Sequence, residues 1–171
     1  MQLKKFLISF IIFLSFFIIP INTNAQEISS NNINQFIVSN NTIEKQHSIY
    51  YKIIDNLTEE DKILICKITF REAGNQSKEG QRAVMEVILN RTVHEDFPNT
   101  IKGVLSQPGQ FSTWKSRDKV TTEQLDEMFI ILKSVQLEKP ILDNNYLYFN
   151  KTKFSNCKQH IKIKDHWFGA I

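Results

Sequence analysis

Glu72 is the residue whose type and position best fit acid–base chemistry. A helix predicted to start at Thr58 ends at Gly74, so Glu72 falls in its last turn, where the helix dipole disfavours a carboxylate. Apolar neighbours also favour the protonated form, and a protonated carboxyl group can donate its proton to a glycosidic oxygen. The ordinary alternative is an exposed Glu72 that pairs with Lys67 or Arg71, since structural ion pairs also perturb carboxylates.

Side chains that bind sugars are concentrated in the segment 107–114. It holds a Pro-Gly turn, a Gln amide, a Ser hydroxyl and two aromatic rings. Proteins hold sugar rings by aromatic stacking and by hydrogen bonds from amides and hydroxyls. A predicted strand adds a Tyr and an Asn of the same kind. The predicted substrate-binding residues are Gln110, Phe111, Ser112, Tyr148 and Asn150.

Two of these assignments have an open alternative. Phe111 fits a place in the hydrophobic core as well as it fits the binding site. Tyr148 faces the site while Leu147 and Phe149 face the core, or the reverse, because successive side chains of a strand point to opposite faces.

A zinc site is the main competing chemistry. Four residues near the C-terminal end have side chains that could bind the metal of an amidase, but their spacing matches no zinc motif that we recognise. They are Cys157, His160, Asp165 and His166. We therefore expect neither a metal nor a cofactor.

The two cysteines, Cys66 and Cys157, allow two interpretations. In an exported protein they could form one disulfide, which would close a long loop and stabilise the fold by several kcal/mol. Cys66 could instead pack as a small apolar side chain of its helix, where it would also be too poorly exposed to act as a nucleophile.

Local signals place the candidate residues on a mostly helical scaffold. Helix starts are predicted where a hydroxyl side chain precedes a run of helical period. An alternation of period two predicts short strands over 146–149 and 161–164. The expected class is α+β, mostly α, as a single domain with a small β element. The predicted helix-starting residues are Thr58, Ser77, Thr100 and Thr121.

The N-terminal segment predicts export. Lys4 and Lys5 precede an apolar run over 6–19, and small residues lead to Ala25, which together form the three parts of a signal peptide. The run is shorter than the roughly 20 residues that cross a bilayer. We expect cleavage after Ala25 and no stable membrane insertion afterwards; the alternative is an uncleaved anchor.

Composition excludes several classes of protein. With 171 residues, of which 42% are hydrophobic, and with few Gly and Pro, the chain is neither disordered nor of low complexity. Removal of residues 1–25 takes away two lysines and no acid, so the mature chain is nearly neutral and offers no broad basic surface for nucleic acid. The Asn- and Ser-rich stretch 26–57 is predicted to be a polar linker or arm, and 58–171 the catalytic domain.

Several short blocks keep a fixed spacing from about Ile63 to Trp114, and two weaker ones follow. They are Arg71-Glu72-Ala73-Gly74, Glu79-Gly80-Gln81, Ala83-Val84, Val87-Ile88-Leu89-Asn90-Arg91, Phe97-Pro98-Asn99-Thr100-Ile101, Gly103-Val104, Gln107-Pro108-Gly109-Gln110-Phe111-Ser112, Tyr146-Leu147-Tyr148-Phe149-Asn150 and His166-Trp167-Phe168. In these residues the chain resembles the SleB-type cell wall hydrolase family, which contains the spore-cortex-lytic enzymes.

The resemblance implies a lysozyme-like, lytic-transglycosylase-like fold and cleavage of peptidoglycan glycan strands between N-acetylmuramic acid and N-acetylglucosamine. Glu72 matches the family's single acid/base. In a lytic transglycosylase it protonates the leaving oxygen and then accepts the proton of the substrate's C6 hydroxyl, whereas two-carboxylate glycosidases need a second acid. The implied enzyme is secreted to the cell wall or the spore envelope, for example to degrade cortex during germination.

The chain departs from the family at two places. Gln76 stands where the family often has a second Glu, and Lys164-Asp165 replaces a glycine before the C-terminal His-x-Phe. The first departure argues against a two-carboxylate mechanism through position 76, and the second leaves the local turn open.

Other functions stay open at this point. Hydrolysis by water would need a second carboxylate, although two of the four candidates share a polar stripe with Arg82, which favours a solvated or structural role. A non-catalytic peptidoglycan-binding module is a further alternative. Because 26–57 is too short and polar for a wall-binding domain, we expect an accessory protein or the cleft itself to localise the chain. The candidate second carboxylates are Glu79, Glu86, Glu95 and Asp96.

Overall fold

The structure is a computed structural model that describes residues 30–171, with side chains from residue 33 onward. The predicted signal peptide lies outside the described residues. No helix within the described range is long and apolar enough to cross a membrane. The elements are α1 (Ser30–Asp55), α2 (Glu59–Ala73), α3 (Lys78–Thr92), α4 (Ile101–Ser106), the 3-10 turn η1 (Trp114–Ser116), α5 (Thr122–Leu137), β1 (Tyr146–Asn150), β2 (Gln159–Ile163) and β3 (His166–Ala170).

The helix starts follow the predicted caps. At each one a side-chain hydroxyl accepts a hydrogen bond from a backbone N–H of the first turn, which satisfies a donor that the helix itself leaves unpaired. Thr121 and Gln124 form a full capping box, in which the Gln side chain also accepts from the backbone of Thr121. The four capping residues are Thr58, Ser77, Thr100 and Thr121.

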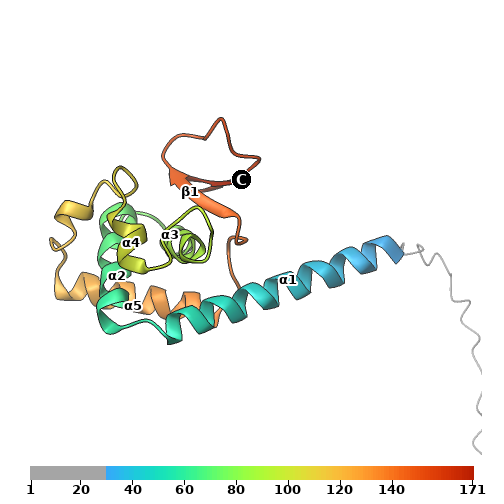
Figure 1. Cartoon of the computed structure of the whole chain (residues 1–171), viewed down its shortest axis with the longest axis horizontal. Coiled ribbons are helices and arrows are strands. Elements are labelled where there is room, and N and C mark those ends of the chain that lie inside the picture. Colours follow the sequence, from blue (N-terminus) through green and yellow to red (C-terminus); the bar gives the residue numbers. More distant parts are fainter. Residues whose placement is uncertain (1–29) are drawn as a thin grey trace, which may run out of the picture.

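Helix α3 is the centre of the fold. Figure 1 shows it end-on, with α2, α4 and α5 on one side and the sheet on the other. Every residue from Gly80 to Arg91 is buried, including five charged or polar ones: Gln81, Arg82, Glu86, Asn90 and Arg91. A helix buried on all sides must find partners for these groups within the protein, so α3 holds the surrounding elements in place.

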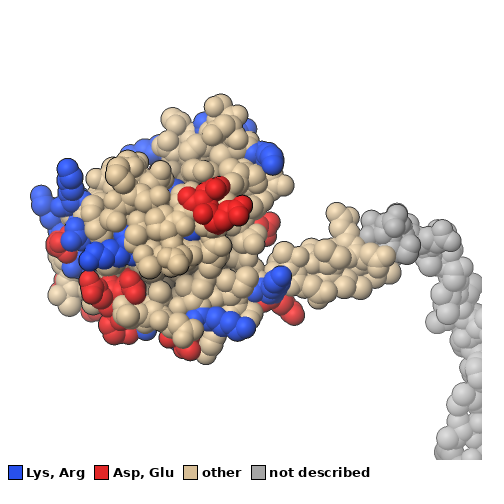
Figure 2. All heavy atoms as spheres, in the orientation of Figure 1, with Lys and Arg blue, Asp and Glu red and all other residues tan. Residues whose placement is uncertain are grey.

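Helix α1 differs from the prediction, because the expected polar linker is helical from Ser30 onward. Tyr50 and Ile54 are fully or almost fully buried, and the Tyr50 hydroxyl donates to Asn90 Oδ1 at 2.8 Å. The N-terminal part projects away from the body, and it carries no charged side chain before Glu44 (Figures 1 and 2). Its apolar residues are too sparse to reveal a period, and packing against α3 and α5 supplies the stability that propensity lacks.

The two predicted strands are confirmed, and a third one, β3, was not predicted. The sheet order is β1-β3-β2 with antiparallel pairs, so the last strand of the chain lies in the middle. Ile163 pairs with His166, which leaves a two-residue turn at the place where the family has a glycine. Lys164 takes the left-handed conformation there, with φ of 50°.

The two departures from the family pattern lie in contact with each other. Gln76 is buried, its Oε1 accepts from the backbone N–H of Asp165 at 3.1 Å, and its Nε2 lies 3.4 Å from the Asp165 carboxylate. The Lys164 ammonium donates to the Asn75 carbonyl. An amide at position 76 therefore ties the turn between α2 and α3 to the β2–β3 turn.

Candidate active site

A cleft with a volume of about 410 Å³ lies between the helical body and the sheet. Five segments that are distant in sequence line it: the end of α2, the end of α3, the loop 109–112, the region from β1 to Phe154, and the start of β3. Of the predicted site residues, Glu72, Gln110, Ser112, Tyr148 and Asn150 meet here. The lining also includes Arg91, Gly109, Phe149, Lys151, Phe154 and His166.

A second hollow, of about 460 Å³, lies beside the ends of α1 and α3. Its only charged lining residues are Lys52 and Asp61, so it brings together much less chemistry than the cleft around Glu72 does. The cleft is therefore the better candidate for an active site.

Glu72 is held by the loop that faces it. Its Oε1 accepts hydrogen bonds from the Thr113 backbone N–H at 2.9 Å, the Thr113 hydroxyl at 2.7 Å and the Ser112 hydroxyl at 3.3 Å. Its Oε2 makes no hydrogen bond with the described residues. The carboxyl group is thus oriented through one oxygen while the other stays available to a ligand.

The alternative partners of Glu72 are engaged elsewhere. Lys67 pairs with Asp118 at 2.8 Å, and Arg71 donates to the Ser116 hydroxyl at 3.4 Å. The structure therefore does not support the interpretation of Glu72 as half of an exposed ion pair.

The loop 109–112 contributes some of its side chains to the cleft and others to the core. Gln110 and Ser112 line the cleft, whereas Phe111 is buried below it, with its ring centroid 6.0 Å from that of Phe149. Gly109 makes the turn with φ of 76°, a conformation that favours glycine. The core interpretation of Phe111 is therefore correct, and its role as a binding residue is not supported.

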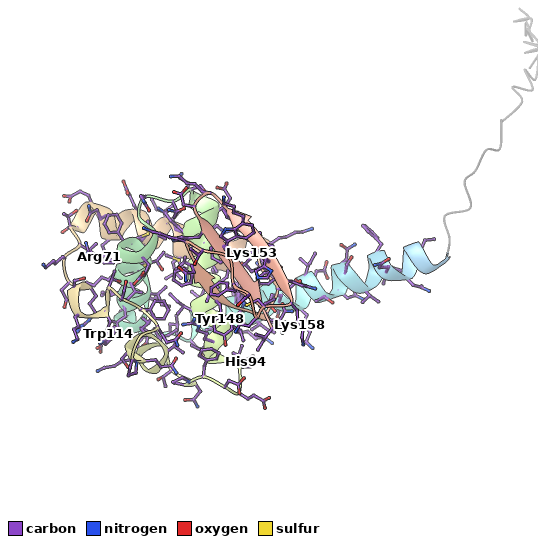
Figure 3. The ribbon with its side chains drawn as sticks, turned by 90° about the horizontal axis from the view of Figure 1, so that it is seen from above. Arg71, His94, Trp114, Tyr148, Lys153 and Lys158 are labelled. Atoms are coloured by element: carbon purple, nitrogen blue, oxygen red, sulfur yellow. The ribbon has the colours of Figure 1, made fainter. Side chains whose placement is uncertain are left out.

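Strand β1 sends two consecutive aromatic residues toward the cleft. Tyr148 and Phe149 both line it, while Leu147 is fully buried. The register shifts between Tyr146 and Tyr148, so simple alternation does not hold. Figure 3 shows Tyr148 between the sheet and the helices.

The sequence did not predict Thr113, Arg91 or His166 as residues of this site, although His166 was considered as a zinc ligand. Thr113 directly follows Ser112, a predicted binding residue, and this adjacency was the only sequence signal for a role of Thr113 in the site. Arg91 is buried, its Nε donates to the Leu147 carbonyl at 2.7 Å, and burial lowers the pKa of its guanidinium to about 10. It stays charged at neutral pH, and an Arg at the end of an apolar helical stripe was the signal for it.

His166 is 3% exposed and faces the cleft from the start of β3. Burial, followed by the positive charge of Lys151, lowers the pKa of its imidazole, against the opposing effects of Asp165 and Glu72. The ring is therefore neutral at neutral pH, and it shares the cleft with Glu72.

The other carboxylates lie outside the cleft. Glu86 is fully buried and accepts from the backbone N–H groups of Ile141 and Leu142 at 3.0 and 2.8 Å, with Arg82 at 3.8 Å. Desolvation raises the pKa of Glu86 to about 7, despite the opposing effect of these hydrogen bonds and of Arg82. Its role is structural. Glu79, Glu95 and Asp96 are exposed.

The cysteines and the proposed zinc ligands serve other contacts. Cys66 and Cys157 are both free and buried, so the disulfide that the sequence allowed is not formed. His160 contacts the Phe154 carbonyl at 2.8 Å. Within residues 30–171 no group of three or more His, Cys, Asp or Glu side chains is placed to hold a metal ion.

Comparison with known proteins gives consistent matches. The sequence model of the Cell Wall Hydrolase family matches residues 75–169, which begin just after Glu72 and include most of the cleft. The catalytic domain of the Bacillus cereus SleB protein is 28% identical, with a TM-score of 0.54 over 67% of this chain and 93% of that one. The catalytic domain of a germination-specific lytic transglycosylase, SleB from Bacillus anthracis, is 26% identical, with a TM-score of 0.54 over 67% of this chain and 97% of that one. Comparison with curated protein sequences finds no similar protein.

Proposed function

The chain belongs to the Cell Wall Hydrolase family, and from this premise we propose that it is an exported lytic transglycosylase that cleaves peptidoglycan between N-acetylmuramic acid and N-acetylglucosamine. The observation that carries the proposal is the single carboxyl group in the cleft: among its lining residues, only Glu72 has one.

Glu72 acts twice in this mechanism. Its proton passes to the glycosidic oxygen as the bond from that oxygen to C1 of the muramic residue breaks. The C6 hydroxyl of the same residue then attacks C1, its proton returns to the Glu72 carboxylate, and a 1,6-anhydro ring closes. No water is consumed, so the scheme requires no second carboxylate.

The contacts of Glu72 and Gln76 support a one-carboxylate site. Thr113 and Ser112 orient Glu72 through one oxygen only, which leaves Oε2 for the proton transfers. Gln76, where relatives often carry a second acid, bonds to the β2–β3 turn instead of lining the cleft. The aromatic rings of Tyr148 and Phe149 and the amides of Gln110 and Asn150 provide surfaces for sugar rings and their acetamido groups.

The proposed location is the cell wall or the spore envelope. It rests on the predicted signal peptide over residues 1–25 and on the family to which the chain belongs. An accessory protein that localises the enzyme, and a role in cortex degradation during germination, are parts of the same proposal.

A zymogram on purified peptidoglycan tests the assignment. The wild-type chain should clear the wall and Glu72→Gln should not, whereas Glu79→Gln, an exposed carboxyl outside the cleft, should clear it normally. Equal clearing by the wild type and Glu72→Gln would contradict the proposal. Tight binding to the wall without released fragments would favour the non-catalytic module.

Mass spectrometry of the products separates the two cleavage chemistries. Transglycosylation leaves 1,6-anhydro ends, and hydrolysis leaves reducing ends that are heavier by one water. Reducing ends as the initial product would show that water attacks, as in a muramidase.

A further inference from the structure

Arg91 is a buried cation without a counter-ion. No carboxylate among the described residues forms a salt bridge with it, its Nη1 is buried without a hydrogen-bond partner, and only its Nε is paired, with the Leu147 carbonyl. Burial of an unpaired charge is costly. The rings of Phe97, Phe111 and Tyr148, with centroids 5.0, 5.3 and 5.8 Å from the guanidinium carbon, offset part of that cost.

Arg82 provides an internal comparison on the same helix. It is similarly buried, but its guanidinium donates to Glu138 at 2.6 Å and to the Lys139 carbonyl at 2.8 Å, and it lies 3.8 Å from Glu86. Arg82 therefore has the partners expected of a structural arginine. Arg91 lacks a comparable acid, and it differs from Arg82 in lining the cleft.

A second cation lies in the same cleft. Lys151 follows β1, is exposed, and lines the cleft together with Arg91. The only acid in the lining is Glu72, and the remaining titratable groups there are His166, which is neutral, and the Tyr148 hydroxyl. The cleft thus has an excess of positive charge in a protein that is nearly neutral after loss of residues 1–25.

We propose that Arg91 and Lys151 form an anion subsite that binds a carboxylate of the glycan strand. This inference rests on the proposed function for the identity of the polymer. Peptidoglycan offers carboxylates from two sources, the lactyl group of muramic acid where no peptide is attached and the stem peptide where one is. A guanidinium forms strong charge-assisted hydrogen bonds with a carboxylate, and the exposed ammonium of Lys151 strengthens the attraction. Neutral glycans would bind weakly.

The experiment measures binding in a Glu72→Gln background, so that no substrate is cleaved. The probes are peptide-bearing strands, peptide-free strands with free lactyl groups, and both strands after conversion of their carboxyls to amides. Lys151→Gln should raise the Kd about five- to tenfold on the strand that carries the recognised carboxylate. Lys151→Arg keeps the positive charge and should bind that strand with the Kd of the protein that has Lys151. Lys153→Gln, whose ammonium lies over Trp167 at 5.5 Å and outside the cleft, should leave the Kd unchanged.

Amidation of the strands gives the reciprocal test. It should weaken binding by the Glu72→Gln protein that keeps Lys151, and it should abolish the difference in Kd between that protein and its Lys151→Gln variant. The strand type on which the difference appears identifies the carboxylate as lactyl or peptide. Arg91→Lys keeps the charge and shows whether the guanidinium geometry contributes, provided that its melting temperature equals that of the wild type.

Equal Kd values for intact and amidated strands, or for Lys151→Gln and Lys153→Gln, would overturn the subsite. These outcomes are separate from the proposed function, which is judged by cleavage with Glu72 intact. A chain that cleaves amidated and intact strands equally well would keep the proposed activity and lose the anion subsite. A chain that binds carboxylates through Lys151 but cleaves no strand would keep the anion subsite and lose the proposed activity.

Discussion

At the scale of single residues, Glu72 and Glu86 show how surroundings divide the roles of two carboxyl groups. Glu72 lines the cleft and accepts from the side chains and backbone of residues 112–113. Glu86 is fully buried on α3 and accepts from two backbone amides that anchor the segment after α5. The first arrangement leaves an oxygen for a ligand, and the second satisfies chain groups that would otherwise be buried unpaired.

Thr113 should affect the rate of catalysis through the orientation of Glu72. Hydrogen bonds to charged groups contribute about 1.5–3 kcal/mol, so Thr113→Val should lower kcat about 10- to 100-fold with little change in KM. Ser112→Ala, which removes a bond of 3.3 Å, should have a smaller effect. Steady-state kinetics on soluble glycan strands measures both, and a Thr113→Val enzyme with normal kcat would contradict this positioning role.

Glu86 should make stability depend on pH. Because the pKa of Glu86 is raised to about 7 in the folded state, the folded chain holds a proton that the unfolded chain releases between about pH 4.3 and 7. In this window each pH unit of increase should lower the free energy of unfolding by about 1.4 kcal/mol, with no further loss above pH 7. Urea unfolding of the wild type and Glu86→Gln at pH 5 and pH 8 measures the difference.

Glu86→Gln removes the titrating group but keeps an oxygen for the amides of Ile141 and Leu142. Its stability should therefore change about 2–3 kcal/mol less between these two pH values than that of the wild type. Parallel pH profiles for the two proteins would show that Glu86 titrates normally despite its burial.

At the scale of elements, local signals determined what could be predicted. Thr58, Ser77, Thr100 and Thr121 cap their helices as expected, because capping depends on neighbours within one turn. Helix α1 and strand β3 were missed for the opposite reason. The Asn-rich start of α1 shows no period, and β3 lies in the middle of the sheet, where three of its residues are buried in succession and alternation is lost.

The contact of Gln76 with the β2–β3 turn gives an element-level prediction. Gln76→Glu would put a second carboxylate beside that of Asp165, which lies 3.4 Å from Gln76 Nε2. We expect a loss of about 1–2 kcal/mol in the free energy of unfolding at pH 7, and a smaller loss near pH 4, where both carboxyl groups become protonated.

Asp165→Asn in the same chain should recover most of this stability, because it removes the repulsion. The products of Gln76→Glu should keep 1,6-anhydro ends, since position 76 does not line the cleft. Reducing ends from this variant would show instead that a carboxyl group at position 76 can activate water.

At the scale of the whole molecule, the cleft is an assembly of segments that are far apart in the chain. Glu72 was predicted from its place at a helix end together with the resemblance to the SleB-type family, and Tyr148 and Asn150 were predicted from a strand pattern. Arg91 and His166 were not predicted as cleft residues, because their burial and their position in the cleft arise only when β1 packs beside α3 and β3 pairs with β1. Residue type alone does not distinguish Arg91 from Arg82, whose acidic partner Glu138 lies at the end of a different helix.

The same packing predicts where the chain can be shortened. Asn90 Oδ1 accepts from Tyr50 and from Gln46 at 2.8 and 3.1 Å, and Asn90 Nδ2 donates to the Asp143 and Tyr146 carbonyls. The end of α1 thus connects to α3 and to the start of the sheet. In contrast, residues 33–39 are exposed, and Phe36 is 67% accessible.

A chain that begins at residue 43 should therefore melt within a few degrees of the chain that begins at residue 26, with equal activity on cell walls. A chain that begins at residue 58, the boundary predicted from sequence, lacks Tyr50 and Ile54, each of which contributes about 1.5–3 kcal/mol by burial. It should be largely unfolded by circular dichroism. Tyr50→Phe in the longer chain isolates the hydrogen bond to Asn90 and should cost about 1 kcal/mol. Full activity and an unchanged melting temperature for the chain that begins at residue 58 would show that α1 is dispensable to the domain.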